Sequence, residues 1–126
     1  MKRKILTGIL VCSLSLGSVL TVSANTVTKP GNNKTTGTTT ITTPGTTYRT
    51  ATVTTTTGNT CSRVTVSGNY RIINGNRIDS LYSSNAYSKK ATDSTTYNPG
   101  GLRVECYGNH VVTGTTNYNF DTYDSF

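Results

Sequence analysis

Apolar and polar residues alternate along much of the chain after residue 48, and this period of two predicts an all-β fold. The alternation is clearest over residues 48–55, 62–67, 102–107 and 115–123, where valines, leucines or aromatic residues share one side and threonines or charged residues the other. β-Branched residues at a period of two are typical of half-buried strands. We therefore expect several short antiparallel strands.

Glycine, asparagine and proline pairs separate these segments. Asn74-Gly75 is the strongest hairpin signal, because both residues tolerate the positive φ of a type I′ turn. Pro99-Gly100-Gly101 ends a second segment. Further turns are predicted at Gly58-Asn59, Gly68-Asn69 and Gly108-Asn109. For residues 78–90 the sequence is compatible with a strand, a loop or a helical turn. Turns at intervals of roughly ten residues predict a small antiparallel β-sandwich or barrel, and we expect the sandwich.

The N-terminus has the pattern of a Gram-positive-type secretory signal peptide over residues 1–24. Met1-Lys2-Arg3-Lys4 is followed by an apolar run that ends in Val22-Ser23-Ala24, small residues suited to a signal peptidase. A membrane anchor is the alternative, but serines and glycines interrupt the run. We expect a secreted, extracellular protein with no stable membrane span after cleavage. Cys12 follows Val11, not a small residue, so it should leave with the signal.

Residues 25–47 are rich in threonine, glycine, asparagine and proline, and Val27 and Ile41 are their only large apolar residues. So few apolar side chains predict a disordered, Thr-rich flexible linker, because little burial would offset the entropy of ordering. The predicted organisation is this linker followed by a small β domain over residues 48–126.

Two cysteines remain after signal cleavage, and an oxidising compartment favours their pairing as a Cys61–Cys106 disulfide. Two separately buried thiols are the alternative. Closing a loop of about 45 residues would stabilise the fold by roughly 4 kcal/mol. In a small domain with few aliphatic residues, such a bridge would matter for folding.

Charge and motif content argue against most chemical functions. Removing the signal takes three of twelve basic residues and leaves a net charge of about +4 on scattered side chains, too sparse for nucleic acid. The single histidine, His110, follows Gly108-Asn109 and is expected at the surface. Asp121 and Asp124 are the only close carboxylate pair near the end, and no nucleophile elbow, zinc spacing or phosphate loop is present. We expect no enzyme activity, no cofactor and no metal.

Tyrosines and two adjacent lysines are the candidate binding residues. Aromatic rings on a sheet can stack on sugars or lie at a membrane interface, and their alternative role is to cover a core poor in aliphatic residues. We expect a binding or interaction module at the bacterial cell surface, with a cell-wall glycan or lipid-linked precursor as partner. The candidates are Tyr82, Tyr87, Tyr97, Tyr107, Tyr118, Lys89 and Lys90, with Tyr123 beside them.

The stretch Tyr82-Ser83-Ser84-Asn85, followed by Lys89-Lys90-Ala91-Thr92 and a tyrosine-rich end, resembles small secreted bacteriocins of the lactococcin 972 type. The resemblance covers residues 81–123 and implies a β-sandwich that interferes with cell-wall synthesis through a lipid-linked precursor. This chain differs in having no tryptophan, an added cysteine pair and a threonine-rich leader. No functional residue is carried across.

Overall fold

The structure is a computed structural model that describes residues 22–44 and 47–126. Within these ranges the chain forms six strands and no helix: β1 Val22–Lys29, β2 Thr35–Thr42, β3 Arg49–Ile72, β4 Arg77–Tyr97, β5 Val104–Thr113 and β6 Tyr118–Ser125. Most of the predicted signal peptide, including Cys12, lies outside the described residues. Its last three residues, Val22-Ser23-Ala24, belong to β1.

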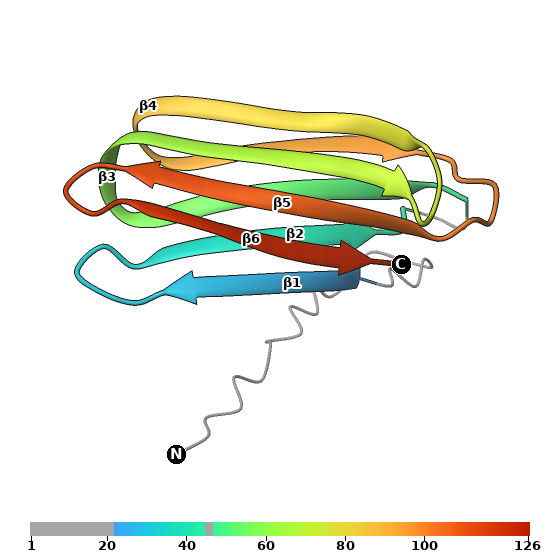
Figure 1. Ribbon diagram of the computed structural model, residues 1–126, viewed down its shortest axis with the longest axis horizontal. Helices are drawn as coiled ribbons and strands as arrows, with labels where there is room; N and C mark the ends of the chain where they lie inside the picture. Colours follow the sequence, from blue (N-terminus) through green and yellow to red (C-terminus); the bar gives the residue numbers. More distant parts are fainter. Residues whose placement is uncertain (1–21, 45–46) are drawn as a thin grey trace, which may run out of the picture.

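All strands belong to one antiparallel sheet in the order β1-β2-β3-β5-β6, with β4 paired to β3 as well. β3 and β4 are long, with 24 and 21 residues, and both fold over near their middle. The first half of β3 pairs with β2 and the end of β4, and the second half pairs with β5 and the start of β4. The sheet therefore forms two facing layers (Figure 1).

The predicted all-β, antiparallel class is confirmed. The structure is one sheet nearly closed into a barrel, not two separate sheets. In Figure 1 the front layer contains the first half of β4, the second half of β3, β5 and β6, and the other halves lie behind with β2 and β1. Segment 78–90, left open by the sequence, is part of β4.

The prediction of a flexible linker over residues 25–47 is wrong for the part that the structure describes. β1 and β2 are paired in an eight-residue ladder, and β2 pairs in turn with β3. Thr35, Thr39 and Ile41 of β2 are completely buried. Threonine is β-branched and therefore suits a strand, and its hydroxyl can find a partner when buried, so a segment with few aliphatic residues can still pack.

The turn predictions had mixed outcomes. Asn74-Gly75 joins β3 to β4, so this hairpin is confirmed. Asn74 has a positive φ of 56° but Gly75 does not, so the turn is not of type I′. Gly58-Asn59 is the corner at which β3 folds over, where Gly58 N–H donates to the carbonyl of Lys34 at 2.9 Å. Gly68 and Gly108 lie in mid-strand, directly opposite each other on β3 and β5. A Cβ on Gly108 would collide with threonine hydroxyls inside the fold, so glycine is needed there for close approach of the layers.

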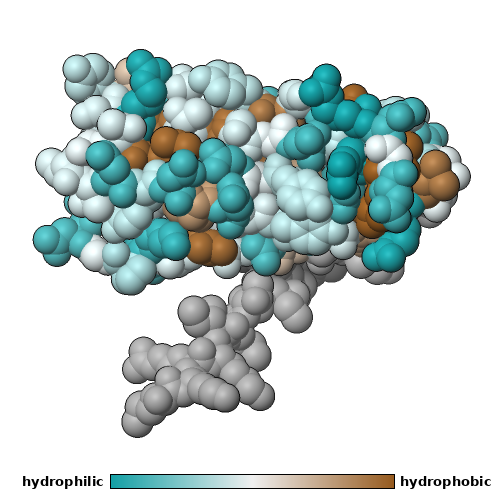
Figure 2. Space-filling view, in the orientation of Figure 1, coloured by the Kyte–Doolittle hydropathy of each residue, from teal (hydrophilic) through white to brown (hydrophobic). Residues whose placement is uncertain are grey.

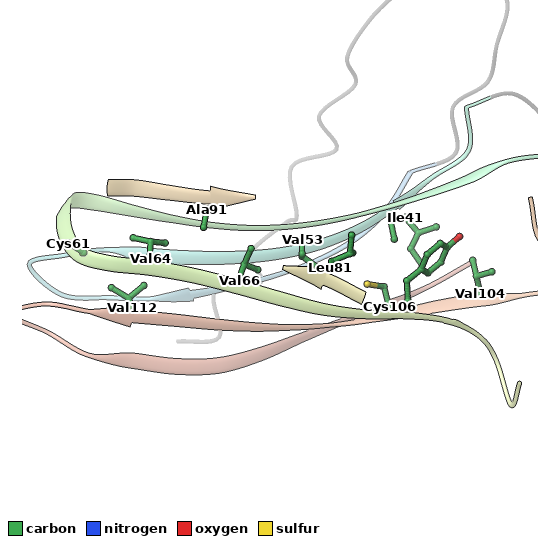
Figure 3. Close-up of a cluster of buried hydrophobic side chains, with 12 residues drawn as sticks. Ile41, Val53, Cys61, Val64, Val66, Leu81, Ala91, Val104, Cys106 and Val112 are labelled. Atoms are coloured by element: carbon green, nitrogen blue, oxygen red, sulfur yellow. The ribbon is translucent and has the colours of Figure 1, made fainter. Parts of the chain in front are cut away.

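The predicted Cys61–Cys106 disulfide is wrong. Both cysteines are buried free thiols. Cys61 lies at the corner of β3 and Cys106 lies opposite Tyr70, nine residues further along that strand, at the other end of the core (Figure 3). Nine residues of strand span about 30 Å, whereas a disulfide needs Cα atoms within about 7 Å.

Each thiol has its own structural environment. Burial, and secondly the charge of Asp124, raise the pKa of Cys106 to about 12, so this thiol stays protonated and unreactive. Cys61 Sγ accepts a hydrogen bond of 2.9 Å from Asn33 Nδ2, and Asn33 Oδ1 accepts one of 2.8 Å from the Asn59 N–H. Cys61 thus helps to attach the β1–β2 turn, which contains Asn33, to the corner of β3. Among the residues that the structure describes, twelve buried side chains from both layers, including the two thiols, form the hydrophobic core: Ile41, Ala51, Val53, Cys61, Val64, Val66, Tyr70, Leu81, Ala91, Val104, Cys106 and Val112.

Candidate functional site

The outer face of the front layer carries a concentrated set of aromatic, amide and charged side chains. On the second half of β3, on β5 and on β6, odd-numbered residues point outward, because even-numbered ones such as Val66, His110 and Phe120 are buried. Strand register then brings outward residues together in cross-strand rows. We call this set the tyrosine face: Ser67, Asn69, Arg71, Glu105, Tyr107, Asn109, Asp121 and Tyr123.

Two tyrosines form the aromatic part of the tyrosine face. Tyr107 on β5 and Tyr123 on β6 are directly opposite in the ladder, with ring centroids 4.7 Å apart and planes inclined by 46°. Their exposed fractions are 45% and 40%. A half-exposed, tilted ring pair offers apolar surface and two hydroxyl groups to the solvent.

A charged pair fixes the position of these rings. Arg71 Nε donates to Glu105 Oε1 at 2.5 Å, and the Tyr123 hydroxyl donates to Glu105 Oε2 at 2.9 Å. The Arg71 guanidinium also lies 5.5 Å from the centroid of Tyr107. The hydrogen bond to Glu105 is the main reason why the pKa values of Arg71 and Tyr123 are raised, so the guanidinium stays charged and the phenol stays protonated. The buried Glu105 carboxylate is thus covered by Arg71 and Tyr123, the two side chains that donate hydrogen bonds to it.

A shallow groove of about 360 Å³ lies beside Tyr107. Its lining contains the outward Ser67, Asn69, Tyr107, Asn109 and Asp121 together with the backbone of Gly68 and Gly108. Figure 2 shows this side of the molecule as a largely polar surface with scattered apolar side chains.

The polar side chains of the groove are already ordered. Asn109 Nδ2 donates to Asn119 Oδ1 at 2.8 Å and to Asp121 Oδ1 at 2.7 Å. Both amide hydrogens of Asn109 can be used in this way, which leaves its carbonyl oxygen oriented and able to accept. The groove therefore presents acceptors of defined direction next to an aromatic surface.

The seven predicted binding residues do not form one cluster. Tyr107 belongs to the tyrosine face, and Tyr82 lies on the same outer surface of β4, opposite Ser67, with 65% of its surface exposed. The other five lie elsewhere: Tyr87, Lys89 and Lys90 at the corner of β4, Tyr97 at its end, and Tyr118 at the start of β6, where its hydroxyl donates to the carbonyl of Pro30 at 3.0 Å.

Sequence reasoning missed the partners that make Tyr107 part of a site. Arg71 and Glu105 face each other across β3 and β5, and Tyr123 reaches Glu105 from β6. The alternation within residues 115–123 could have shown that Asp121 and Tyr123 share a side, opposite to Phe120. The pairing of β5 with both neighbours could not be read from that pattern.

His110 is not at the surface, contrary to the prediction. It is completely buried in β5, and its ring stacks on Phe120 with centroids 5.1 Å apart. Nδ1 lies 2.8 Å from Thr55 Oγ1, and Nε2 lies 2.7 Å from Thr122 Oγ1, which is 2.5 Å from Thr39 Oγ1. Burial, opposed by the charge of Asp121, lowers the pKa of His110 to about 4. This neutral imidazole links both layers through hydroxyl groups and is shielded from any substrate.

Among residues 22–44 and 47–126, no three metal-binding side chains come together. Over the same ranges, no helix has the length and apolar character of a membrane span. No family model, curated protein or solved structure matches the chain. The tyrosine face and its groove are therefore the candidate site on geometry alone.

Proposed function

We propose that the protein is a non-enzymatic binding module that holds an uncharged segment of a cell-wall glycan on the tyrosine face. The observation that carries the proposal is the Tyr107–Tyr123 ring pair beside a groove lined by Asn69, Asn109 and Asp121. A sugar ring has an apolar face that packs on aromatic rings and hydroxyl groups that donate to amide and carboxylate oxygens. Convergent polar groups beside aromatic surface are typical of ligand sites.

The charges of the site favour an uncharged ligand over phosphate. Arg71 is paired with Glu105, so its positive charge is compensated within the tyrosine face. Asp121 lines the groove itself and would repel a phosphate or carboxylate bound there. The ligand class that fits is therefore a glycan bound through hydroxyl and ring contacts.

The cellular setting belongs to the same proposal. The predicted signal peptide would bring the protein to the outside of the cell, where wall glycans are found. Cleavage after Ala24 would remove three residues of β1 and leave the tyrosine face unchanged, because that face lies on β3, β5 and β6.

We also propose that the flattened, nearly closed barrel is best grouped with small antiparallel β-sandwiches.

The test is binding of the purified protein to isolated bacterial cell walls and to a glycan array. Replacing Tyr107 or Tyr123 by alanine (Y107A, Y123A) should weaken binding at least about tenfold, a loss of about 1.4 kcal/mol. Tyr48→Ala is the matched control, since Tyr48 is half exposed and precedes β3 on the other layer. Equal binding by wild type and Tyr107→Ala, or retention of no glycan at all, would contradict the proposal. Growth inhibition without glycan binding would support the bacteriocin interpretation in its place.

A further inference from the structure

The outer face of the back layer carries a two-dimensional array of threonines. Even-numbered residues of β1, β2, the first half of β3 and the second half of β4 point outward there, because the odd-numbered residues of β2 and of residues 51–57 in β3 are buried. Register aligns them in four cross-strand rows. We call the array the threonine face: Thr28, Thr36 and Thr56; Thr26, Thr38, Thr54 and Thr92; Thr40, Thr52 and Ser94; and, at its end, Thr42, Thr50 and Thr96.

Contacts between neighbouring hydroxyls order this array. In the described part of the array, four cross-strand pairs have Oγ1 atoms within hydrogen-bond distance: Thr26–Thr38 and Thr28–Thr36 at 3.2 Å, Thr50–Thr96 at 2.8 Å and Thr54–Thr92 at 2.7 Å. A β-branched side chain already has restricted χ1, and these contacts restrict it further. The hydroxyl and methyl groups are thus arranged before any partner arrives, which lowers the entropy cost of binding.

The array has two regular spacings. Neighbouring strands are about 4.8 Å apart, and outward residues on one strand are about 6.6 Å apart. A surface that repeats in both directions is complementary to a partner that also repeats in two directions. A single flexible chain would match only one of the two spacings.

The charge of the array restricts the partner further. Among the outward residues described on these strands, from Thr26 to Thr96, only Lys90 is charged, and it lies at a corner of the array opposite Thr56. Such a neutral face offers no complement to anionic wall polymers, lipid headgroups or nucleic acid. It is complementary to an uncharged lattice of hydrogen-bonding groups with apolar gaps for the methyl groups.

We propose that the threonine face binds ice. Oxygen atoms on a prism face of hexagonal ice repeat in two perpendicular directions with spacings similar to those between strands and along a strand. Threonine hydroxyls on that pattern take positions of lattice oxygens, and the methyl groups fit between them. The array begins at Thr26, after the predicted cleavage site, so the secreted chain keeps it whole. This function is independent of the tyrosine face, which lies on the opposite layer.

The experiment measures ice recrystallisation and thermal hysteresis with the purified protein. Wild-type protein should inhibit recrystallisation and shape growing crystals. Thr54→Lys places a charge and a long side chain at the centre of the array, and at least a tenfold higher concentration should be needed for the same inhibition. Thr40→Val keeps the shape and removes one hydroxyl, so it should have a smaller effect.

Thr113→Lys is the matched control, because Thr113 is exposed on β5 in the other layer and receives the same change. It should inhibit recrystallisation like wild type. Circular dichroism and binding by the tyrosine face check that each variant is folded. No inhibition by wild type, or equal inhibition by Thr54→Lys, would overturn the proposal. The proposal would also be overturned if wild type left ice unaffected and Thr54→Lys abolished another activity of the threonine face. That activity would be binding to a microcrystalline polysaccharide or self-association.

Discussion

Asp124 Oδ2 on β6 accepts a hydrogen bond of 2.9 Å from the backbone N–H of Ile41 on β2. The two strands are not neighbours in the sheet, so this side chain joins the inner strand β2 of one layer to the edge strand β6 of the other. Asp93 does the same at the other edge, where its Oδ2 accepts from the N–H of Tyr82 at 2.9 Å. Two carboxylates thus accept hydrogen bonds from backbone donors of the facing layer in a sheet that almost closes.

Removing the Asp124 carboxylate should destabilise the fold. Asp124→Ala leaves the buried N–H of Ile41 without this acceptor, and an unsatisfied buried donor costs roughly 1–3 kcal/mol. Urea unfolding measures the change. Asp93→Ala is the comparison and should cost less, since its hydrogen bond lies at an exposed edge where water can replace it. Equal effects of the two variants would contradict the difference in burial between the two hydrogen bonds.

Acid should weaken the fold through His110. Its pKa is about 4 in the folded protein and about 6.5 when unfolded, so the unfolded chain takes up the proton first. The contribution is fully present above pH 6.5 and is lost as the pH falls towards 4, by about 3 kcal/mol. Denaturation between pH 7 and 4 measures it. His110→Gln should be less stable at pH 7 and should lose less stability on acidification, and an unchanged slope would contradict this account.

Reducing agents should not change the stability of the protein. Cys61 and Cys106 are free thiols at opposite ends of the core, so dithiothreitol has no bond to break. Melting temperatures with and without dithiothreitol should agree, and iodoacetamide should modify both thiols only after unfolding. A lower melting temperature under reduction would show that a disulfide forms after all.

The sequence predicted the features that depend on local conformation. The hairpin at Asn74-Gly75 was found because tolerance of a positive φ, which Asn74 adopts, is a property of the residue itself. Gly68-Asn69 and Gly108-Asn109 have the composition of a turn, but their glycines face each other in mid-strand. Glycine is needed there because the fold leaves little space for a side chain, and not because the chain turns. His110 was predicted at the surface for the same reason, because a residue that follows a turn at Gly108-Asn109 would be exposed.

Long-range packing explains the other differences. Cysteine number and compartment suggested a bridge, but neither gives the distance between Cys61 and Cys106. The small number of aliphatic residues predicted that residues 25–47 are flexible. That criterion ignores the threonines of β2, which are buried on one face of the strand and make hydroxyl contacts with threonines of the neighbouring strand on the other face. Tyr107 was named as a binding residue, whereas its partners Arg71 and Glu105 required the register of β3 with β5.

The core and the threonine face both include β2, and both require it to be an inner strand of the sheet. Amide hydrogen exchange of residues 35–42 measures this most directly. The ladders of β2 with β1 and β3 predict slow exchange, with protection close to that of the second half of β3. Exchange at the rate of an unfolded chain in residues 35–42, with protection retained in β5, would contradict the account.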